Sequence, residues 1–148
     1  AEEVGTGEGK GYTVNVPLEP GMGDNEFIKI FDEILKPVIE QYKPEFILVS
    51  AGFDIFFEDP LGGMKVSPEG FAKLTRQLTD QADKVCNGNI IFLLEGGYNL
   101  DCLWISTKEM LEELLDKKRS EYDIGDTKTK ADDLIENIKK VYSDYWDF

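Results

Sequence analysis

The sequence predicts an α/β fold, a parallel sheet flanked by helices, and three observations support this prediction. Two short apolar runs, residues 46–50 and 89–94, have the length of strands that are buried on both faces. Each run ends at a glycine-containing turn, where the backbone can change direction sharply. An amphipathic segment, residues 68–85, separates the two runs. Strand, helix and strand in this order form a crossover unit whose strands are parallel.

The length and composition of the chain limit the number of domains and the kinds of partner. Its 148 residues, 41% of them hydrophobic, are enough for one domain with a buried core. The formal net charge of −14 argues against direct nucleic-acid binding. It is compatible with a cationic substrate, although solubility is the preferred explanation of an acidic surface.

Cysteine usage and hydropathy indicate the cellular setting. Cys86 and Cys102 lack C-x-x-C spacing, so we expect neither a disulfide framework nor a zinc knuckle. A reducing, cytoplasmic setting is therefore the default expectation. We expect no membrane association, because no apolar run approaches the roughly 18 residues of a membrane span and residues 1–10 contain no signal-peptide core.

The segment before the first apolar run is expected to contain a strand and a helix. Glycine occupies every second position over residues 5–11 and leads into the β-prone residues 12–17, a predicted strand. A phosphate-binding loop has a different glycine spacing and is followed by a helix, so we exclude it. Asp24 is predicted to cap a helix over residues 25–42, which Pro37 should kink or restart.

The later helices have clear start and stop signals. Ser67 is a predicted N-cap for the helix over residues 68–85, and Asn99 for a helix over residues 100–115. The buried side of this second helix is predicted to carry Leu103, Trp104, Thr107, Met110, Leu111, Leu114 and Leu115. A charged surface loop should follow, and then a last amphipathic helix.

Asp54 and Tyr98 are the candidate functional residues. Asp54 lies just past the first apolar run, and Tyr98 lies just past the second. Because the carboxyl ends of parallel strands meet at one edge, both should project from the same edge of the sheet, where ligands bind. An acidic residue there is a candidate metal ligand or general base, but it can equally cap a turn or a helix. The apolar loop over residues 55–64 is either a pocket rim or is buried beneath a neighbouring loop.

Five sequence blocks resemble those of the histone deacetylase family, which includes deacetylase-like proteins of bacteria and archaea and the acetylpolyamine amidohydrolases. They occur in the family's order and together span about residues 5–115. The blocks are GEGKGYTVNVPL (residues 7–18), VSAGFD (49–54), DPLG (59–62), SPEGF (67–71) and LEGGYNL (94–100).

The resemblance implies a fold, a reaction and roles for particular residues. The fold is of the arginase-deacetylase type, and the reaction removes acetyl from the ε-amino group of lysine or from a polyamine. In the family's pattern Asp54 is a zinc ligand and Tyr98 donates its hydroxyl to the acetyl carbonyl. Gly96 and Gly97 line a narrow channel for the acyl-lysine stem. Tyr12 takes the place of a residue whose backbone carbonyl binds a monovalent cation such as K⁺.

The departures from the family's pattern are equally informative. The chain contains no histidine, whereas the family takes its other zinc ligands from a D-x-H segment and its general bases from paired histidines. Ile55-Phe56 also differs from the usual Ala-His or Ala-Ala. We therefore expect residues 1–148 to be the carboxyl-terminal part of a single deacetylase domain. Alone, the chain should be inactive and prone to self-association, because the upstream half that supplies the missing groups is absent.

Two alternatives come from other functional classes. One is a ligand-binding module that uses the Gly96-Gly97 turn, at the start of a helix, as an anion site. The other is a stand-alone, non-catalytic interaction protein. The blocks do not distinguish histones, other acetylated proteins and acetylated polyamines as substrates.

Overall fold

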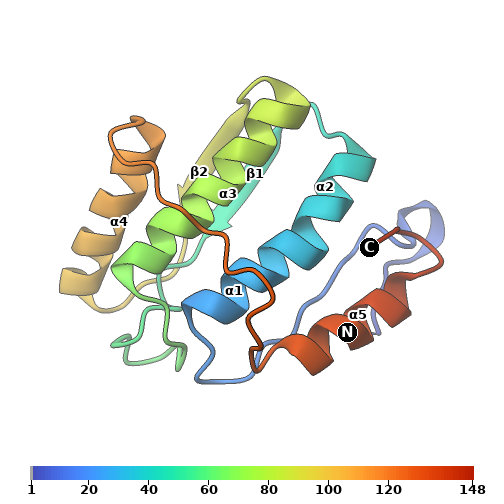
Figure 1. The fold of residues 1–148 in the computed structure, drawn as a ribbon, viewed down its shortest axis with the longest axis horizontal. Helices are drawn as coiled ribbons and strands as arrows, with labels where there is room; N and C mark the ends of the chain where they lie inside the picture. Colours follow the sequence, from blue (N-terminus) through green and yellow to red (C-terminus); the bar gives the residue numbers. More distant parts are fainter. Residues whose placement is uncertain (1) are drawn as a thin grey trace.

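The computed structural model describes residues 2–148 and contains a parallel pair of strands (Figure 1). Strand β1 (Ile47–Ala51) pairs with β2 (Ile90–Leu94) in a register that runs from Ile47 opposite Ile90 to Ala51 opposite Leu94. The helical segments are η1 (Gly7–Gly9), α1 (Asp24–Ile30), η2 (Phe31–Leu35), α2 (Lys36–Tyr42), α3 (Pro68–Cys86), α4 (Leu100–Leu114) and α5 (Asp132–Tyr142). The predicted parallel crossover is therefore confirmed.

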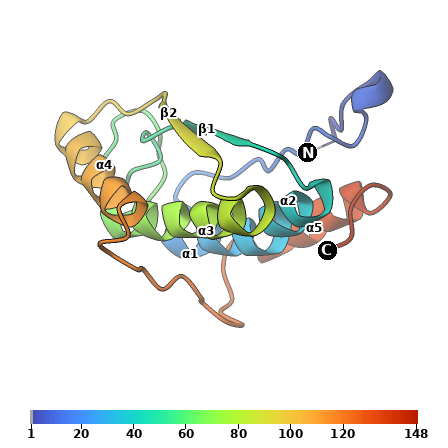
Figure 2. The ribbon, with the colours of Figure 1, turned by 90° about the horizontal axis from the view of Figure 1, so that it is seen from above.

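The helices cover one face of the strand pair and leave the other face open. In Figure 2, α1, α2 and α3 lie on one side of β1 and β2, while α4 packs beside α3. Leu48 is 68% exposed and Ile91 is 46% exposed. The prediction that both strands are buried on both faces is therefore wrong for the described part of the chain, since nothing within residues 2–148 covers this side.

Pro37 lies next to a change of helix type. A π-helical turn, η2, separates α1 from α2, and Pro37 occupies the first turn of α2. Proline cannot donate a backbone hydrogen bond within a helix, and the wider π-turn accommodates the loss without breaking the helix axis. The predicted helix over residues 25–42 is thus confirmed, with a restart at Pro37.

Two predictions about the amino-terminal segment are wrong. Residues 12–17 form no strand, because they have no partner strand within the described chain. Asp24 is not an N-cap: Gly23 precedes α1, and the Gly23 N–H donates to Glu26 Oε2 at 2.9 Å. Asp24 instead accepts from the backbone N–H of Ser67 at 2.8 Å and from its hydroxyl at 2.6 Å. It therefore joins the start of α1 to the start of α3.

The predicted caps of α3 and α4 are confirmed. The predicted buried side of α4 is right for Leu103 and Met110, which pack against the core, and wrong for the exposed residues Trp104, Leu111, Leu114 and Leu115. Ser67 Oγ accepts from the Gly70 N–H at 3.1 Å, and Asn99 Oδ1 accepts from the Cys102 N–H at 3.3 Å. Trp104 is 67% exposed and Leu115 is 62% exposed. The residues of α4 that are buried are Cys102, Ser106 and Glu113. Helix α4 packs on α3 through a narrower face than its apolar stripe suggested.

Helix α5 packs against α1 and η2 and covers that side of the core. Its buried residues Ile135, Ile138 and Tyr142 belong to the same apolar cluster as residues of α1 and η2. The backbone N–H of Asn15 donates to the Tyr142 hydroxyl at 2.9 Å. The indole N–H of Trp146 donates to the Gly11 carbonyl at 2.8 Å. The first and last segments of the chain therefore lie against each other.

Replacing Ile138 with alanine should lower the free energy of unfolding by about 2–5 kcal/mol, because a fully buried side chain leaves a cavity. The matched control is Ile91→Ala, on the open face of the sheet, which should cost no more than about 1 kcal/mol. Urea titration followed by far-UV circular dichroism measures both changes. Equal losses at the two positions would show that the core is not where the structure places it.

Two further observations concern the cysteines and the helices. Cys86 and Cys102 are both buried and free. No helix that the structure describes in residues 2–148 has the length and apolar character needed to cross a bilayer.

Candidate functional site

The carboxyl edge of the sheet holds Asp54 against Gly96. The hydrogen bonding continues past the strands, since the Phe53 N–H donates to the Gly96 carbonyl at 2.8 Å and the Glu95 N–H donates to the Ala51 carbonyl at 3.1 Å. A Cβ atom built on Gly96 would lie 2.6 Å from Asp54 Oδ2, which is closer than atoms of side chains approach. The half-buried carboxylate of Asp54 therefore occupies the space that a side chain at position 96 would need.

Tyr98 follows immediately and presents its side chain to solvent. It is 58% exposed, and its backbone N–H donates to Asp59 Oδ2 at 2.8 Å. Gly97 before it has a φ of +134°, and a Cβ there would lie 2.9 Å from the Cβ of Phe53. Glycine is needed at this position both for the backbone angle and for the close approach. The structure thus brings Asp54, Gly96, Gly97 and Tyr98 together at one edge of the sheet.

Asp59 is an organising residue of this edge to which the sequence analysis gave no role. Its Oδ1 accepts from the backbone N–H groups of Leu61 at 2.9 Å and of Gly62 at 3.1 Å. Desolvation raises the pKa of Asp59, but the backbone N–H groups of Tyr98, Leu61 and Gly62 outweigh it, so the pKa lies below its usual value. The signal in the sequence is Asp-Pro-Leu-Gly, a pattern typical of an aspartate that holds its own turn.

The apolar loop after Asp54 is partly buried and partly at the surface. Phe56 is 3% exposed and stacks on Phe57 with ring centroids 4.4 Å apart, whereas Phe57 is 49% exposed. Phe53 stacks on Phe71 of α3 at 5.0 Å, which anchors the start of the loop. Phe56 is therefore buried, as the interpretation of a covered loop requires, and Phe57 is left at the surface. The interpretation of this loop as a pocket rim stays a prediction.

Tyr12 lies away from this edge. Its ring contacts Tyr42 and Trp146 edge to face, each with a centroid distance of 5.8 Å. Tyr42 ends α2, from which the chain enters the amino end of β1. The structure therefore separates Tyr12 from Asp54 and Tyr98, and a cation at its carbonyl would be distinct from the candidate site.

The described residues do not make a complete metal site. Within residues 2–148 there is no group of three histidine, cysteine, aspartate or glutamate side chains placed to hold a metal ion. The carboxylate of Asp54 suits zinc as one oxygen ligand, but a catalytic zinc site takes three protein ligands. The donor set of this part of the chain therefore fits zinc only in combination with further ligands.

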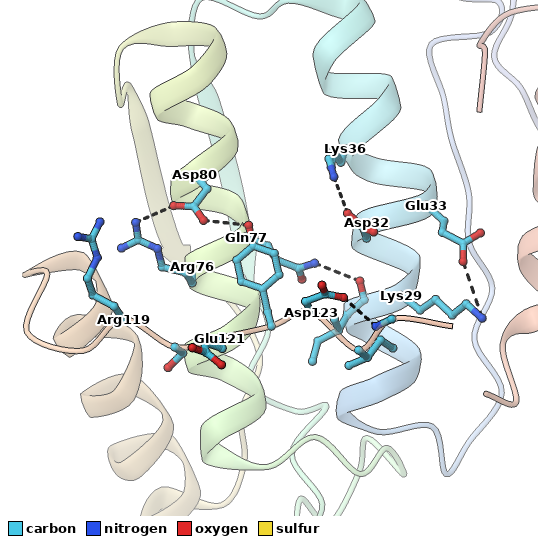
Figure 3. Close-up of a pocket in the computed structure, with 15 residues that line it drawn as sticks. Lys29, Asp32, Glu33, Lys36, Arg76, Gln77, Asp80, Arg119, Glu121 and Asp123 are labelled. Carbon is cyan, nitrogen blue, oxygen red and sulfur yellow. Dashed lines mark hydrogen bonds and ion pairs between the residues drawn. The ribbon is translucent and has the colours of Figure 1, made fainter. Parts of the chain in front are cut away.

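A large cavity lies elsewhere, on the helical side of the molecule (Figure 3). It has a volume of about 710 Å³ and lies between α1, η2, α3 and the loop over residues 119–125. Arg76 pairs with Asp80 at 2.7 Å, and Lys36 pairs with Asp32 at 2.7 Å. Burial raises the pKa of Tyr122 to about 12, and its hydrogen bond to Asp80 acts in the same direction.

These pairs show that much of the charge around the cavity is already compensated within the protein. None of the residues that line the cavity belongs to the loops that carry Asp54 and Tyr98. Size alone therefore does not make it the functional site, and the carboxyl edge of the sheet is the better candidate.

The comparisons with known proteins agree on one family. The family model described as "Histone deacetylase domain" matches residues 1–114. A protein of Archaeoglobus fulgidus called "Probable deacetylase" is 38% identical over 164 residues, which cover 98% of this chain and 44% of that protein. "Histone deacetylase 14, chloroplastic" of Arabidopsis thaliana is 35% identical over 95% of this chain and 35% of its own length.

Solved structures give the same result for the fold. The chain superposes on the HD domain of HDA15 with a TM-score of 0.86 at 33% identity, covering 99% of this chain and 38% of that chain. On the histone deacetylase Clr3 the TM-score is 0.88 at 32% identity, covering 99% of this chain and 24% of that chain. The chain therefore spans less than half the length of these relatives.

Proposed function

The chain belongs to the histone deacetylase family, and from that premise we propose that it is the carboxyl-terminal part of a zinc-dependent deacetylase domain. The reaction proposed is the removal of acetyl from acetyl-lysine or from acetylated polyamines. One observation carries the proposal: Asp54 and the loop Gly96-Gly97-Tyr98 meet at the carboxyl edge of the parallel strands. A cytoplasmic location stays a prediction.

In this proposal the residues of the edge have separate tasks. Asp54 holds the metal through its carboxylate, and zinc, when bound, supplies Lewis-acid polarisation of the acetyl carbonyl and of water. Tyr98 donates its phenolic O–H to the carbonyl oxygen as negative charge develops on it. The backbone of Gly96 and Gly97 lines the approach of the extended stem of the acetylated amine, while Asp54 and Phe53 pack on the side where a Cβ would lie. The Tyr12 carbonyl is proposed as a K⁺ ligand at a separate place.

The open face of the sheet supports the proposal that part of the domain lies outside this chain. Parallel strands are normally covered on both faces, yet Leu48, Ile91 and Leu93 are exposed here by 68%, 46% and 48%. Both strands also have an outer edge that pairs with no other strand among the described residues. We propose that the rest of the domain, which the longer relatives contain, covers this face and pairs with these edges. In isolation the same surfaces favour self-association.

The chain by itself is expected to show no deacetylation of an acetyl-lysine peptide or an acetylated polyamine, because it offers one metal ligand and no histidine base. The complete domain, or the chain mixed with a separately produced upstream segment, should be active in the same assay. Release of acetate from both substrates is the measurement. Activity from the chain alone would refute the incomplete-site proposal, and an inactive complete domain loaded with zinc would refute the deacetylase proposal.

The second candidate is a non-catalytic interaction protein, and the outer face of α4 is the observation that favours it. Leu100, Trp104 and Leu115 line a shallow apolar groove of about 480 Å³. A stable monomer of this chain that binds a partner through the groove, without any upstream segment, would support this candidate. The anion-site alternative at Gly96-Gly97 has no further support from the structure, since the negatively charged carboxylate of Asp54 lies directly against Gly96.

A further inference from the structure

Asp59 connects the loop that follows Asp54 with the loop that carries Tyr98. One carboxylate oxygen, Oδ1, accepts from Leu61 and Gly62 within its own turn, at 2.9 and 3.1 Å. The other oxygen, Oδ2, accepts from the Tyr98 N–H at 2.8 Å, which is a contact across 39 residues of sequence. The two oxygens of a single side chain therefore hold two different loops.

The first of these loops is packed directly on Asp54. A Cβ built on Gly62 would lie 1.6 Å from the carbonyl oxygen of Asp54, so the backbone at Gly62 lies against the backbone at Asp54. The turn that Asp59 holds through Oδ1 is thus the segment that packs against the proposed metal ligand. A residue with any side chain at position 62 would displace one backbone from the other.

Apart from this contact, the second loop is fixed by the backbone hydrogen bond from the Phe53 N–H to the Gly96 carbonyl at 2.8 Å and by the packing of Gly96 and Gly97 against Asp54 and Phe53. Gly96 and Gly97 precede Tyr98 and have no side chains to anchor them, and glycine is the residue with the greatest backbone freedom. A neighbouring contact acts in the same direction, since the side-chain amide of Asn99 donates to the Glu58 carbonyl at 3.1 Å. Asn99 also caps α4, so the helix, the Tyr98 loop and the Asp59 turn form one connected unit.

We propose that Asp59 is a positioning residue that sets the placement of Tyr98 relative to Asp54. This inference rests on the deacetylase function proposed above. The physical reason is that a catalytic hydrogen-bond donor contributes fully only when it is held close to its productive position, and a displacement of about 1 Å can cost about 100-fold in rate. Asp59 touches neither substrate nor metal and acts through the backbone of Tyr98.

Two substitutions separate the functions of the carboxylate oxygens. Asp59→Asn keeps an oxygen for Leu61 and Gly62 but replaces the acceptor of the Tyr98 N–H with an amide that only donates. Asp59→Ala removes both sets of hydrogen bonds. The matched control is Asp101→Asn, which makes the same chemical change at an exposed position in the first turn of α4.

In the complete zinc-loaded deacetylase, Asp59→Asn is expected to lower kcat by about 10- to 100-fold, with KM and zinc content close to those of the parent. Asp101→Asn should leave all three unchanged. The decisive measurement combines both substitutions. If Asp59 acts through Tyr98, adding Asp59→Asn to the Tyr98→Phe enzyme should lower kcat hardly any further. A loss of the same size in both backgrounds would overturn the proposal and show a general structural role.

Hydrogen exchange of the Tyr98 amide tests the physical link without any assay of activity. In the parent protein this amide should be protected, and Asp59→Asn should lower the protection at least about tenfold while leaving β1 and β2 unchanged. Unchanged protection of Tyr98 in Asp59→Asn would overturn the positioning role. If the parent protein is inactive but Asp59→Asn still lowers the protection of the Tyr98 amide, the deacetylase proposal alone is contradicted. The two failures are therefore distinguishable.

Discussion

Replacing Tyr98 with phenylalanine in the complete zinc-loaded domain should lower kcat by about 10²–10³-fold, a loss of about 2.7–4 kcal/mol of transition-state stabilisation. The substitution removes one hydroxyl and leaves the ring, so the packing of the loop is preserved. The Tyr98 side chain is exposed, and it follows the Gly96-Gly97 turn against which Asp54 packs. Because the charge on the acetyl oxygen develops only in the transition state, the loss should appear in kcat and hardly at all in KM.

The control for this substitution is Tyr42→Phe. Tyr42 is 57% exposed, lies at the end of α2 and meets a proposed site only through its ring contact with Tyr12, which phenylalanine preserves. Steady-state kinetics with an acetyl-lysine peptide, together with zinc content, should show the parent's values for this variant. If the Tyr98→Phe enzyme kept the parent's kcat, the phenol would take no part in the reaction, and Tyr98 would be only a surface residue of the loop.

Replacing Asp54 with asparagine should remove the metal as well as the activity. Asparagine has nearly the same shape as aspartate, so it fits the space left by Gly96, but it lacks the charge that a zinc ligand supplies. Loss of a residue that only supports a ligand already costs about 10- to 100-fold in metal affinity, and loss of the ligand itself should cost more. Activity should therefore fall below detection at zinc concentrations that saturate the parent.

Zinc bound per protein after dialysis is the direct measurement for Asp54→Asn, and the thermal unfolding midpoint of the metal-free protein checks that the fold is intact. Asp101→Asn is again the matched control and should retain zinc and activity. If Asp54→Asn kept its full zinc content, Asp54 would be a structural aspartate at a turn, which is the alternative that the sequence left open.

The parts of the fold that the sequence predicts correctly are those decided by neighbouring residues. Ser67 before Pro68 starts α3, and Asn87 with a φ of +55° ends it, because capping and left-handed turns depend on a few adjacent side chains. The glycine turns after β1 and β2 likewise placed Asp54 and Tyr98 near one edge. These are local rules, and the structure follows them.

The predictions that are wrong concern contacts between segments that are distant in the sequence. The helical periodicity places Trp104 and Leu111 on the buried side of α4, but both are exposed, because α4 contacts α3 with only part of its apolar stripe. Residues 12–17 have the composition of a strand, but a strand also needs a partner at hydrogen-bonding distance. Asp59 was overlooked because its contact with Tyr98 joins residues that are distant in sequence and close only after the crossover forms.

The contact between the two ends of the chain has a consequence for its synthesis. The Asn15 amide meets the Tyr142 hydroxyl across 127 residues, and Trp146 reaches the Gly11 carbonyl across 135. Translation produces residues 11–15 before α1, whereas their partners emerge only after α3 and α4. Contacts of such long sequence separation form late and slow the folding of a domain. The amino-terminal segment must therefore remain without its final packing while α1, α3 and α4 are already available to assemble.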